Sequence, residues 1–409
     1  MIRIIKHFII GFILTFAFLS IHTAHAVDKP NFVVIVVDDA GYGDFSSFGG
    51  TYKTPSIDSL ATNGIKFTNF YAESVCTPSR AALITGRYPD SFGLNSALGV
   101  DSPQGLPNNV LTLPGALKNL GYQTALVGKW HLGHNPGQQP LDHGFDFFYG
   151  MLHGESRSYD KHLDKNNNVD WYRNRTKIVV TEYSTTAITR ESVNFIDRNS
   201  NKPFYLQVAY QAPHVPFQLP GDPINSSKPA VYGQMLRYVD QGVGNILQKL
   251  KAEGIANKTY VLFYSDNGGY AGHNGILRGV KDGVYEGGIR VPFILHYPSM
   301  NNSVSAIPKI VQDIFPTFLK LAGGNTSPAL VGENLFTNDY NRYMFWYNSH
   351  GKYAVRKGNW KLVVTPTGNA LYNLNTDVKE TTNVAGANPA ITNDLQNALR
   401  NWKTSVGKH

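Results

Sequence analysis

Short apolar runs alternate along the chain with segments of helical periodicity. Residues 235–252 have helical spacing, with one stripe made of Leu236, Val239, Val243, Leu247 and Leu250. A shorter helical pattern covers residues 113–120, and the apolar runs lie at 32–37, 122–127, 204–209, 260–264 and 293–296. Strands that alternate with helices are typical of a parallel sheet covered by helices. The pattern therefore predicts an α/β fold, in which helices sandwich a large mixed, mostly parallel sheet.

The residue pattern changes at about residue 341, where strand and helix patterns stop alternating. Four short aromatic and β-branched segments, separated by Gly and Asn, lie at 343–347, 353–355, 360–364 and 371–374. They predict a small antiparallel sheet, and the pattern near residues 391–402 predicts a helix that closes it. We expect a main domain over residues 27–340 and a C-terminal subdomain over residues 341–409.

The first 26 residues have the features of a signal peptide. Arg3 and Lys6 precede an apolar run over residues 9–19, and Ala24 and Ala26 form a small-residue cleavage site. The run is about half of the ~20 apolar residues that a spanning helix needs. The segment predicts cleavage after Ala26, export to the periplasm or the medium, and no stable membrane anchor.

Charge and cysteine content narrow the functional classes. The chain carries a net charge of +8, and removal of Arg3 and Lys6 with the signal peptide leaves about +6. This excess suits a polyanionic partner, although a basic surface that serves only solubility fits equally well. Basic runs with interleaved aromatics are absent from the sequence, which disfavours nucleic acid as the partner.

Cys76 is the single cysteine, so it cannot form a disulfide within the chain, and in an exported protein an unpaired cysteine needs another reason to be present.

Polar pairs follow two of the predicted strands. Asp38 and Asp39 come after the run 32–37, and Asp266 and Asn267 come after 260–264. In α/β sheets ligands bind beyond the carboxyl ends of the strands, and adjacent carboxylates repel each other unless a cation separates them. Three carboxylates and an amide oxygen suit calcium or magnesium better than zinc. A turn or a helix cap is the alternative for either pair alone.

The segment around Cys76 has a distinctive pattern: Cys76–Arg80 reads Cys-Thr-Pro-Ser-Arg and is followed by a small-residue helix and Thr-Gly-Arg. This pattern resembles the Cys-x-Pro-x-Arg signature of the type I sulfatases of the alkaline phosphatase superfamily. Further family-like motifs lie on both sides of this segment and in the family's order, at residues 38–44, 128–133, 212–214, 266–268, 277–281, 286–292 and 356–362. The resemblance covers nearly all of the chain after residue 30.

The resemblance implies a catalytic assignment. It implies that a formylglycine-generating enzyme oxidises Cys76 to formylglycine, and that residue 76 joins Asp38, Asp39, Asp266 and Asn267 around a calcium ion, or a magnesium ion. In this assignment the hydrated aldehyde attacks the sulfur of a sulfate ester. The remaining roles are fixed positive charge from Arg80, Lys129 and Lys281, a base at His131, and a leaving-group acid at His214 assisted by Lys281.

Other functions remain as alternatives. A phosphatase or phosphodiesterase of the same superfamily would carry Ser or Thr in place of Cys76 and additional metal ligands. A cysteine hydrolase would need a His paired with a thiolate. The chain could also be a module that binds sulfated glycans without catalysis.

The substrate is the least determined feature. Export and positive charge favour a sulfated polysaccharide or its oligosaccharides, with an algal galactan such as carrageenan ahead of a glycosaminoglycan or a simple aryl sulfate. The aperiodic stretch 150–176 is the expected substrate loop. Its contacts are predicted from charge and position to be His153, Arg157, His273 and Arg356, while Trp171 and Trp346 would either stack on sugars or lie in the core. The sequence does not predict an oligomeric state.

Overall fold

The computed structural model describes residues 29–408. The predicted signal peptide therefore lies outside the described residues. Within them, no helix is both long and apolar enough to cross a membrane.

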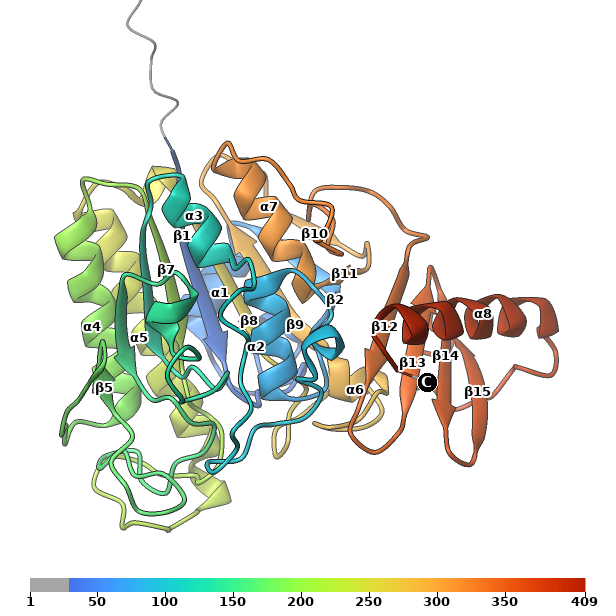
Figure 1. Ribbon diagram of the computed structural model, residues 1–409, viewed down its shortest axis with the longest axis horizontal. Coiled ribbons are helices and arrows are strands. Elements are labelled where there is room, and N and C mark those ends of the chain that lie inside the picture. Colours follow the sequence, from blue (N-terminus) through green and yellow to red (C-terminus); the bar gives the residue numbers. More distant parts are fainter. Residues whose placement is uncertain (1–28, 409) are drawn as a thin grey trace, which may run out of the picture.

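The main body is built on a mixed sheet of 11 strands in the order β10-β2-β9-β8-β1-β7-β3-β4-β5-β6, with β11 beside β2 (Figure 1). The strands are β1 (Asn31–Val37), β2 (Ile65–Tyr71), β3 (Gln123–Gly128), β4 (Phe147–Gly150), β5 (Tyr172–Arg173), β6 (Thr176–Lys177), β7 (Phe204–Ala209), β8 (Thr259–Ser265), β9 (Arg290–His296), β10 (Ser303–Ser305) and β11 (Lys309–Ile310). The central strands β8, β1, β7 and β3 are parallel to one another, whereas β9 runs antiparallel to β8 and β2.

Helices cover both faces of this sheet. They are α1 (Pro55–Thr62), α2 (Cys76–Thr85), α3 (Leu113–Asn119), α4 (Ser184–Asn199), α5 (Tyr232–Ala252) and α7 (Ile314–Leu321). The short α6 (Glu286–Ile289) directly precedes β9 and packs against the C-terminal sheet instead. Side chains of β1 point alternately to two cores: Val34 joins the core with α2, α3 and α7, and Ile35 joins the core with α1, α4 and α5. Burial on both faces explains why residues 32–37 are apolar throughout rather than alternating.

A second sheet of four antiparallel strands follows near the C-terminus. It consists of β12 (Tyr343–Tyr347), β13 (Tyr353–Lys357), β14 (Trp360–Thr365) and β15 (Gly368–Asn373), and the helix α8 (Pro389–Ser405) covers one face (Figure 1). On the other face, Met344 and Trp346 pack against Tyr71, Ile289 and Ile310 of the main body. The small sheet is thus wedged between its own helix and the main body.

The predicted fold class is confirmed. Each apolar run named from the sequence forms a strand, and the two helical patterns form α3 and α5. Strand β2 escaped prediction because its partly buried, edge-like sequence contains Lys66, Thr68 and Asn69 among the apolar residues. The stretch 150–176 is less open than a free loop, since it includes β5 and the fully buried Trp171. The division at residue 341 stays a prediction.

Candidate active site

Four neighbouring parallel strands end at one edge of the sheet, and each delivers polar residues there. Strand β1 leads to Asp38 and Asp39, and β8, paired with it through Val37 and Ser265, leads to Asp266 and Asn267. On the other side of β1, β7 leads into the turn that holds His214, and β3 leads to Lys129 and His131. The register of the sheet therefore gathers residues that are up to about 230 positions apart in the chain, such as Asp39 and Asn267.

Gly128 makes the approach of Lys129 possible. It has a φ of +117°, and a Cβ there would lie 1.9 Å from the carbonyl oxygen of Ala209. Only glycine fits this close pairing of β3 with β7. The chain then turns so that the N–H of Lys129 donates to Ala209, 2.9 Å away, and its ammonium pairs with Asp38.

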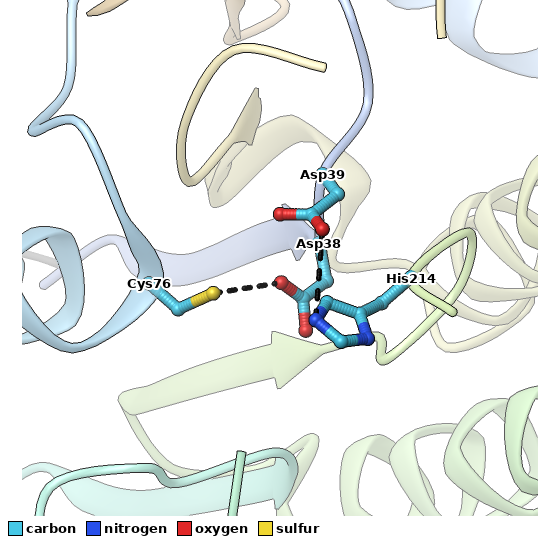
Figure 2. Close-up of side chains that lie close together, drawn as sticks. All are labelled: Asp38, Asp39, Cys76 and His214. Atoms are coloured by element: carbon cyan, nitrogen blue, oxygen red, sulfur yellow. Dashed lines mark hydrogen bonds and ion pairs between the residues drawn. The ribbon is translucent and has the colours of Figure 1, made fainter. Parts of the chain in front are cut away.

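Cys76 is the first residue of α2 and is 1% exposed. Its Sγ lies 3.3 Å from Oδ1 of Asp38, with Asp39 and His214 close by (Figure 2). Burial, and then the charge of Asp38, raises the pKa of the Cys76 thiol far above its usual value. An unmodified Cys76 therefore stays a neutral thiol, which argues against a cysteine hydrolase, because the thiolate is the nucleophile in such enzymes.

Fixed cations balance the buried carboxylates. Burial by itself would raise the pKa of Asp38, but Lys129, His214 and Arg80 hold it well below the usual range. The guanidinium of Arg80 donates to Asp266 at 2.8 Å and to the carbonyl oxygen of Lys129 at 3.0 Å. Burial, and then the neighbouring Asp38, raises the pKa of Asp266 to about 7. Arg80 thus connects both strand ends that carry the carboxylates.

Asp39 is the meeting point of the remaining groups. Its backbone is left-handed, with a φ of +66°, and its N–H donates to Asp266 at 3.3 Å. Its carboxylate accepts hydrogen bonds from Lys281 and from Nδ2 of Asn267, each at 2.8 Å. The Nε2 atom of His214 lies 3.5 Å from the same carboxylate.

The buried polar cluster has the composition of a metal site. Asp38, Asp39, Cys76 and His214 each offer a ligand atom within 4.8 Å of the others, and all four are buried. Asp266 adjoins them, and Oδ1 of Asn267 is buried without a hydrogen-bond partner. A buried amide oxygen left unpaired costs free energy unless something else binds it, and a cation among carboxylates would do so. His214, which the sequence assigned to the leaving group, lies within this ligand-like group.

His214 is anchored from two sides. Its Nδ1 lies 2.6 Å from the carbonyl oxygen of Val215, and its own carbonyl oxygen accepts a 2.6 Å hydrogen bond from the buried hydroxyl of Tyr159. Burial lowers the pKa of His214 although Asp39 and Asp38 favour the charged form. Tyr159 was missed from the sequence, where its only signal was its place in the stretch 150–176.

His131 borders a small hollow beside the carboxylate cluster. Its Nε2 lies 2.9 Å from the carbonyl oxygen of Leu98, and its buried Nδ1 has no partner. Burial, and then Lys129, lowers its pKa well below the usual value, so the ring is neutral. The hollow is lined by His131, His134 and His153 together with Leu98 and its neighbours, and its volume of about 10 Å³ is what a single water molecule fills. It places a predicted catalytic residue beside a predicted substrate contact but is too small to admit a sugar.

The four predicted substrate contacts are placed very differently. His153 is half-buried and its Nδ1 lies 3.1 Å from Asp170; burial alone would lower its pKa, but Asp170 raises it above the usual value. Arg157 is bonded to Asn225 at 2.6 Å, across two surface loops. His273 lies against the turn at Gly41 and Gly43, and its carbonyl oxygen accepts a 2.6 Å hydrogen bond from Gly43.

Arg356 does not lie where a substrate could reach it. It is 1% exposed, and its guanidinium donates to the hydroxyl of Tyr71 and, at 2.9 Å, to the carbonyl oxygen of Gly358. The prediction of a substrate contact is therefore corrected: Arg356 fills the space between the two sheets, where a basic residue type gave no hint of burial. Trp346 is likewise part of that core.

Comparison with known proteins agrees with this geometry. The model of the Sulfatase family matches residues 30–324. The chain is 34% identical over 381 residues to rat (Rattus norvegicus) N-acetylgalactosamine-6-sulfatase, covering 84% of this chain and 73% of that protein. It is 35% identical over 322 residues to mouse (Mus musculus) arylsulfatase J, covering 72% of this chain but only 53% of the longer relative.

Solved structures show the same architecture. The crystal structure of Ps i-CgsB in complex with k-i-k-neocarrahexaose superimposes with a TM-score of 0.85 at 31% identity, covering 91% of this chain and 92% of the other. The PsFucS1 sulfatase from Pseudoalteromonas sp. has a TM-score of 0.77 at 26% identity, covering 93% and 91%. From the family match, the extent of these similarities and the carboxylate cluster at the strand ends, we conclude that the chain belongs to the sulfatase family and has its alkaline-phosphatase-like fold.

Proposed function

We propose that this chain hydrolyses sulfate esters of a sulfated polysaccharide or its oligosaccharides, with residue 76 as the nucleophile after oxidation of Cys76 to formylglycine. The observation that carries the proposal is the position of Cys76. It is the first residue of α2, whose residues are all buried, and its Sγ faces Asp38. Around it lie three carboxylates and three cationic side chains that pair with them. Burial raises the pKa of the unmodified thiol, which disfavours the thiolate that a cysteine nucleophile needs. As a formylglycine, residue 76 would lie where the metal ligands and the cations converge.

The groups that the chain would hold supply the nucleophile and a Lewis acid. Hydrated formylglycine would supply a geminal diol, and a calcium ion, favoured over magnesium, would supply positive charge between Asp38, Asp39, Asp266, Asn267 and residue 76. The formylglycine rests on the family, and the cation rests on the family and on the unpaired Oδ1 of Asn267.

The chain's own residues would bind the sulfate and move protons. Arg80 and Lys129 are buried and held in place by carboxylates, so they supply positive charge that does not need to reorganise. The side chain of Lys281 is 16% exposed, so it could also meet the ester oxygen. His214 is the proposed acid for that oxygen, a role that needs its protonated form, which Asp39 and Asp38 favour against the effect of burial. Neutral His131 could accept a proton from the diol.

The substrate proposal rests on charge and on the relatives. The net charge of +8 favours a polyanion, and a structure 31% identical to this chain has a neocarrahexaose bound. We therefore place a carrageenan-type galactan ahead of a glycosaminoglycan or an aryl sulfate, with His153, Arg157 and His273 as the proposed contacts. Export into the periplasm or the medium, and maturation by a formylglycine-generating enzyme, are part of the same proposal.

A two-part experiment tests this function. The chain is produced with and without a formylglycine-generating enzyme, and mass spectrometry of the peptide that contains Cys76 measures conversion of the thiol to the aldehyde. Each preparation is then incubated with defined oligosaccharides from carrageenans, fucoidan, heparan and chondroitin, and NMR locates any lost sulfate. We expect turnover only after conversion and none in Cys76→Ala. Full activity with an unmodified thiol contradicts the mechanism. Converted protein that binds these glycans without cleaving them indicates a non-catalytic module.

A further inference from the structure

The segment that carries Lys281 lies against the C-terminal sheet. Asn348 directly follows β12 and is fully buried, and its Nδ2 donates to the carbonyl oxygen of Asp282 at 2.6 Å. Asp282, the residue after Lys281, has a left-handed backbone with a φ of +66°. Asp is one of the few residues other than glycine that adopt this conformation, and the contacts of its backbone with neighbouring segments help to hold it.

The side chain of Asn348 is oriented by its other end. Its Oδ1 accepts hydrogen bonds from the N–H groups of His350 at 3.2 Å and Lys352 at 3.1 Å, in the turn between β12 and β13. Because the oxygen must face these two donors, the amide nitrogen must face Asp282. The turn of the small sheet therefore aims one donor at the backbone next to Lys281.

The same strand also contacts the segment that leads to Cys76. Trp346, two residues before Asn348 and on the same face of β12, donates from its indole nitrogen to the carbonyl oxygen of Ala72 at 3.0 Å. The two contacted segments are joined to each other, since the N–H of Asp282 donates to the carbonyl oxygen of Ser74 at 2.7 Å. Strand β12 thus borders the approaches to both Cys76 and Lys281.

We propose that Asn348 is a positioning residue that sets where Lys281 stands relative to residue 76. It acts through the backbone of Asp282 and does not itself touch the substrate. The ammonium of Lys281 reaches Asp39 at 2.8 Å, so a change in the backbone after it alters the geometry at the carboxylate cluster. This inference rests on the proposed function only where it predicts rates; the contact with Asp282 is independent of it.

The test compares Asn348→Ser with Asn383→Ser. Asn383 lies in the same subdomain and makes the same kinds of bonds: its Oδ1 accepts from the N–H two residues ahead, of Ala385 at 3.0 Å, and its Nδ2 donates to a carbonyl oxygen, of Asn369 at 3.2 Å. Serine retains an oxygen that can cap such a turn but lacks the reach of the amide. Of the two, only Asn348 adjoins the Lys281 segment. Asn383 is exposed whereas Asn348 is fully buried, so N383S controls for loss of a turn contact, and melting temperatures control for loss of packing.

Three readouts follow. In hydrogen exchange, the peptide over residues 278–286 should exchange faster in N348S than in the wild type. Its exchange rate in N383S should equal that of the wild type. In kinetics of the matured enzyme, N348S should lower kcat for a sugar or alkyl sulfate roughly tenfold or more, with less than about a twofold loss for 4-nitrophenyl sulfate, because a poor leaving group depends most on a well-placed cation. In a Lys281→Ala background, N348S should add no further loss.

Three results would overturn the proposal: unchanged exchange over residues 278–286, equal losses for both classes of substrate, or a further loss in the Lys281→Ala background. If N348S folds poorly, melting temperatures reveal it, and exchange at a lower temperature still compares the two variants. If the matured wild type cleaves no sulfate ester, the proposed function fails. The exchange result then decides by itself whether Asn348 holds the segment.

Discussion

Glu73 is a buried acid that should make the stability of this protein depend on pH. It lies three residues before Cys76, is 3% exposed, and accepts a 2.8 Å hydrogen bond from the side-chain amide of Gln312. Burial, and then the neighbouring Asp90, raises the pKa of Glu73 to about 8. At neutral pH its carboxyl is therefore protonated in the folded protein and ionised in the unfolded chain.

The size of the effect follows from the two pKa values. The usual value is 4.5 and the folded value is about 8, so at about 1.4 kcal/mol per pH unit the stability decreases by about 5 kcal/mol across that interval. The sign is set by proton binding: the folded state binds the proton more tightly. Its contribution is fully present below pH 4.5 and is lost as the pH rises to about 8. Glu73→Gln stays neutral and can still accept the hydrogen bond from Gln312.

Urea unfolding at several pH values measures this directly. Between about pH 5 and pH 8, the stability of Glu73→Gln relative to the wild type should increase by about 4 kcal/mol. At pH 6–7 the wild type should release about one more proton on unfolding than the variant. The control is Glu155→Gln, which changes an exposed glutamate paired with Lys165 and should follow the wild type at every pH. A stability difference between Glu73→Gln and wild type that does not change with pH would refute the reasoning.

Three further predictions concern the site and its borders. Asn267→Ala should raise the calcium concentration needed to increase the melting temperature roughly tenfold or more, because a buried oxygen is lost; an unchanged calcium titration by scanning fluorimetry would remove Asn267 from the ligands. His214→Ala should reduce kcat for an alkyl sulfate roughly a hundredfold, and for 4-nitrophenyl sulfate much less; equal losses in steady-state assays would transfer the acid role to Lys281. Arg356→Met should lower the free energy of unfolding by about 2–4 kcal/mol and leave KM unchanged, since the guanidinium is buried against Tyr71; a raised KM at full stability would restore the substrate contact.

The sequence by itself determined the frame of the sheet and the residue types at its edge. A run such as residues 32–37, apolar at every position, is typical of a strand covered on both faces, and β1 is buried throughout. Polar pairs placed after two such runs lie at the same edge of a parallel sheet, and they meet here because β1 and β8 are neighbours: the N–H of Asp39 lies 3.3 Å from Oδ1 of Asp266. Local patterning predicted the residue types at the edge, whereas the pairing of β1 with β8 is a property of the tertiary structure.

The C-terminal sheet was predictable in its strands but not in its docking. Residues 343–347 form β12 as the aromatic and β-branched pattern predicted. Which face meets the main body depends on side chains of β2, α6 and β11, which are distant in sequence, and these bury Met344 and Trp346. The alternation of side chains along a strand shows which residues share a face. It does not show which other element of the protein packs against that face.

Only the tertiary structure decided which polar residues are available for chemistry. Arg356 and Arg157 are the same residue type, yet one is sealed between two sheets and the other bridges surface loops. The contact of Asn348 with Asp282 spans 66 positions and exists because the subdomain docks beside the Lys281 segment. Burial and hydrogen-bond partners are properties of the packed chain, since long-range contacts that no local window contains create them.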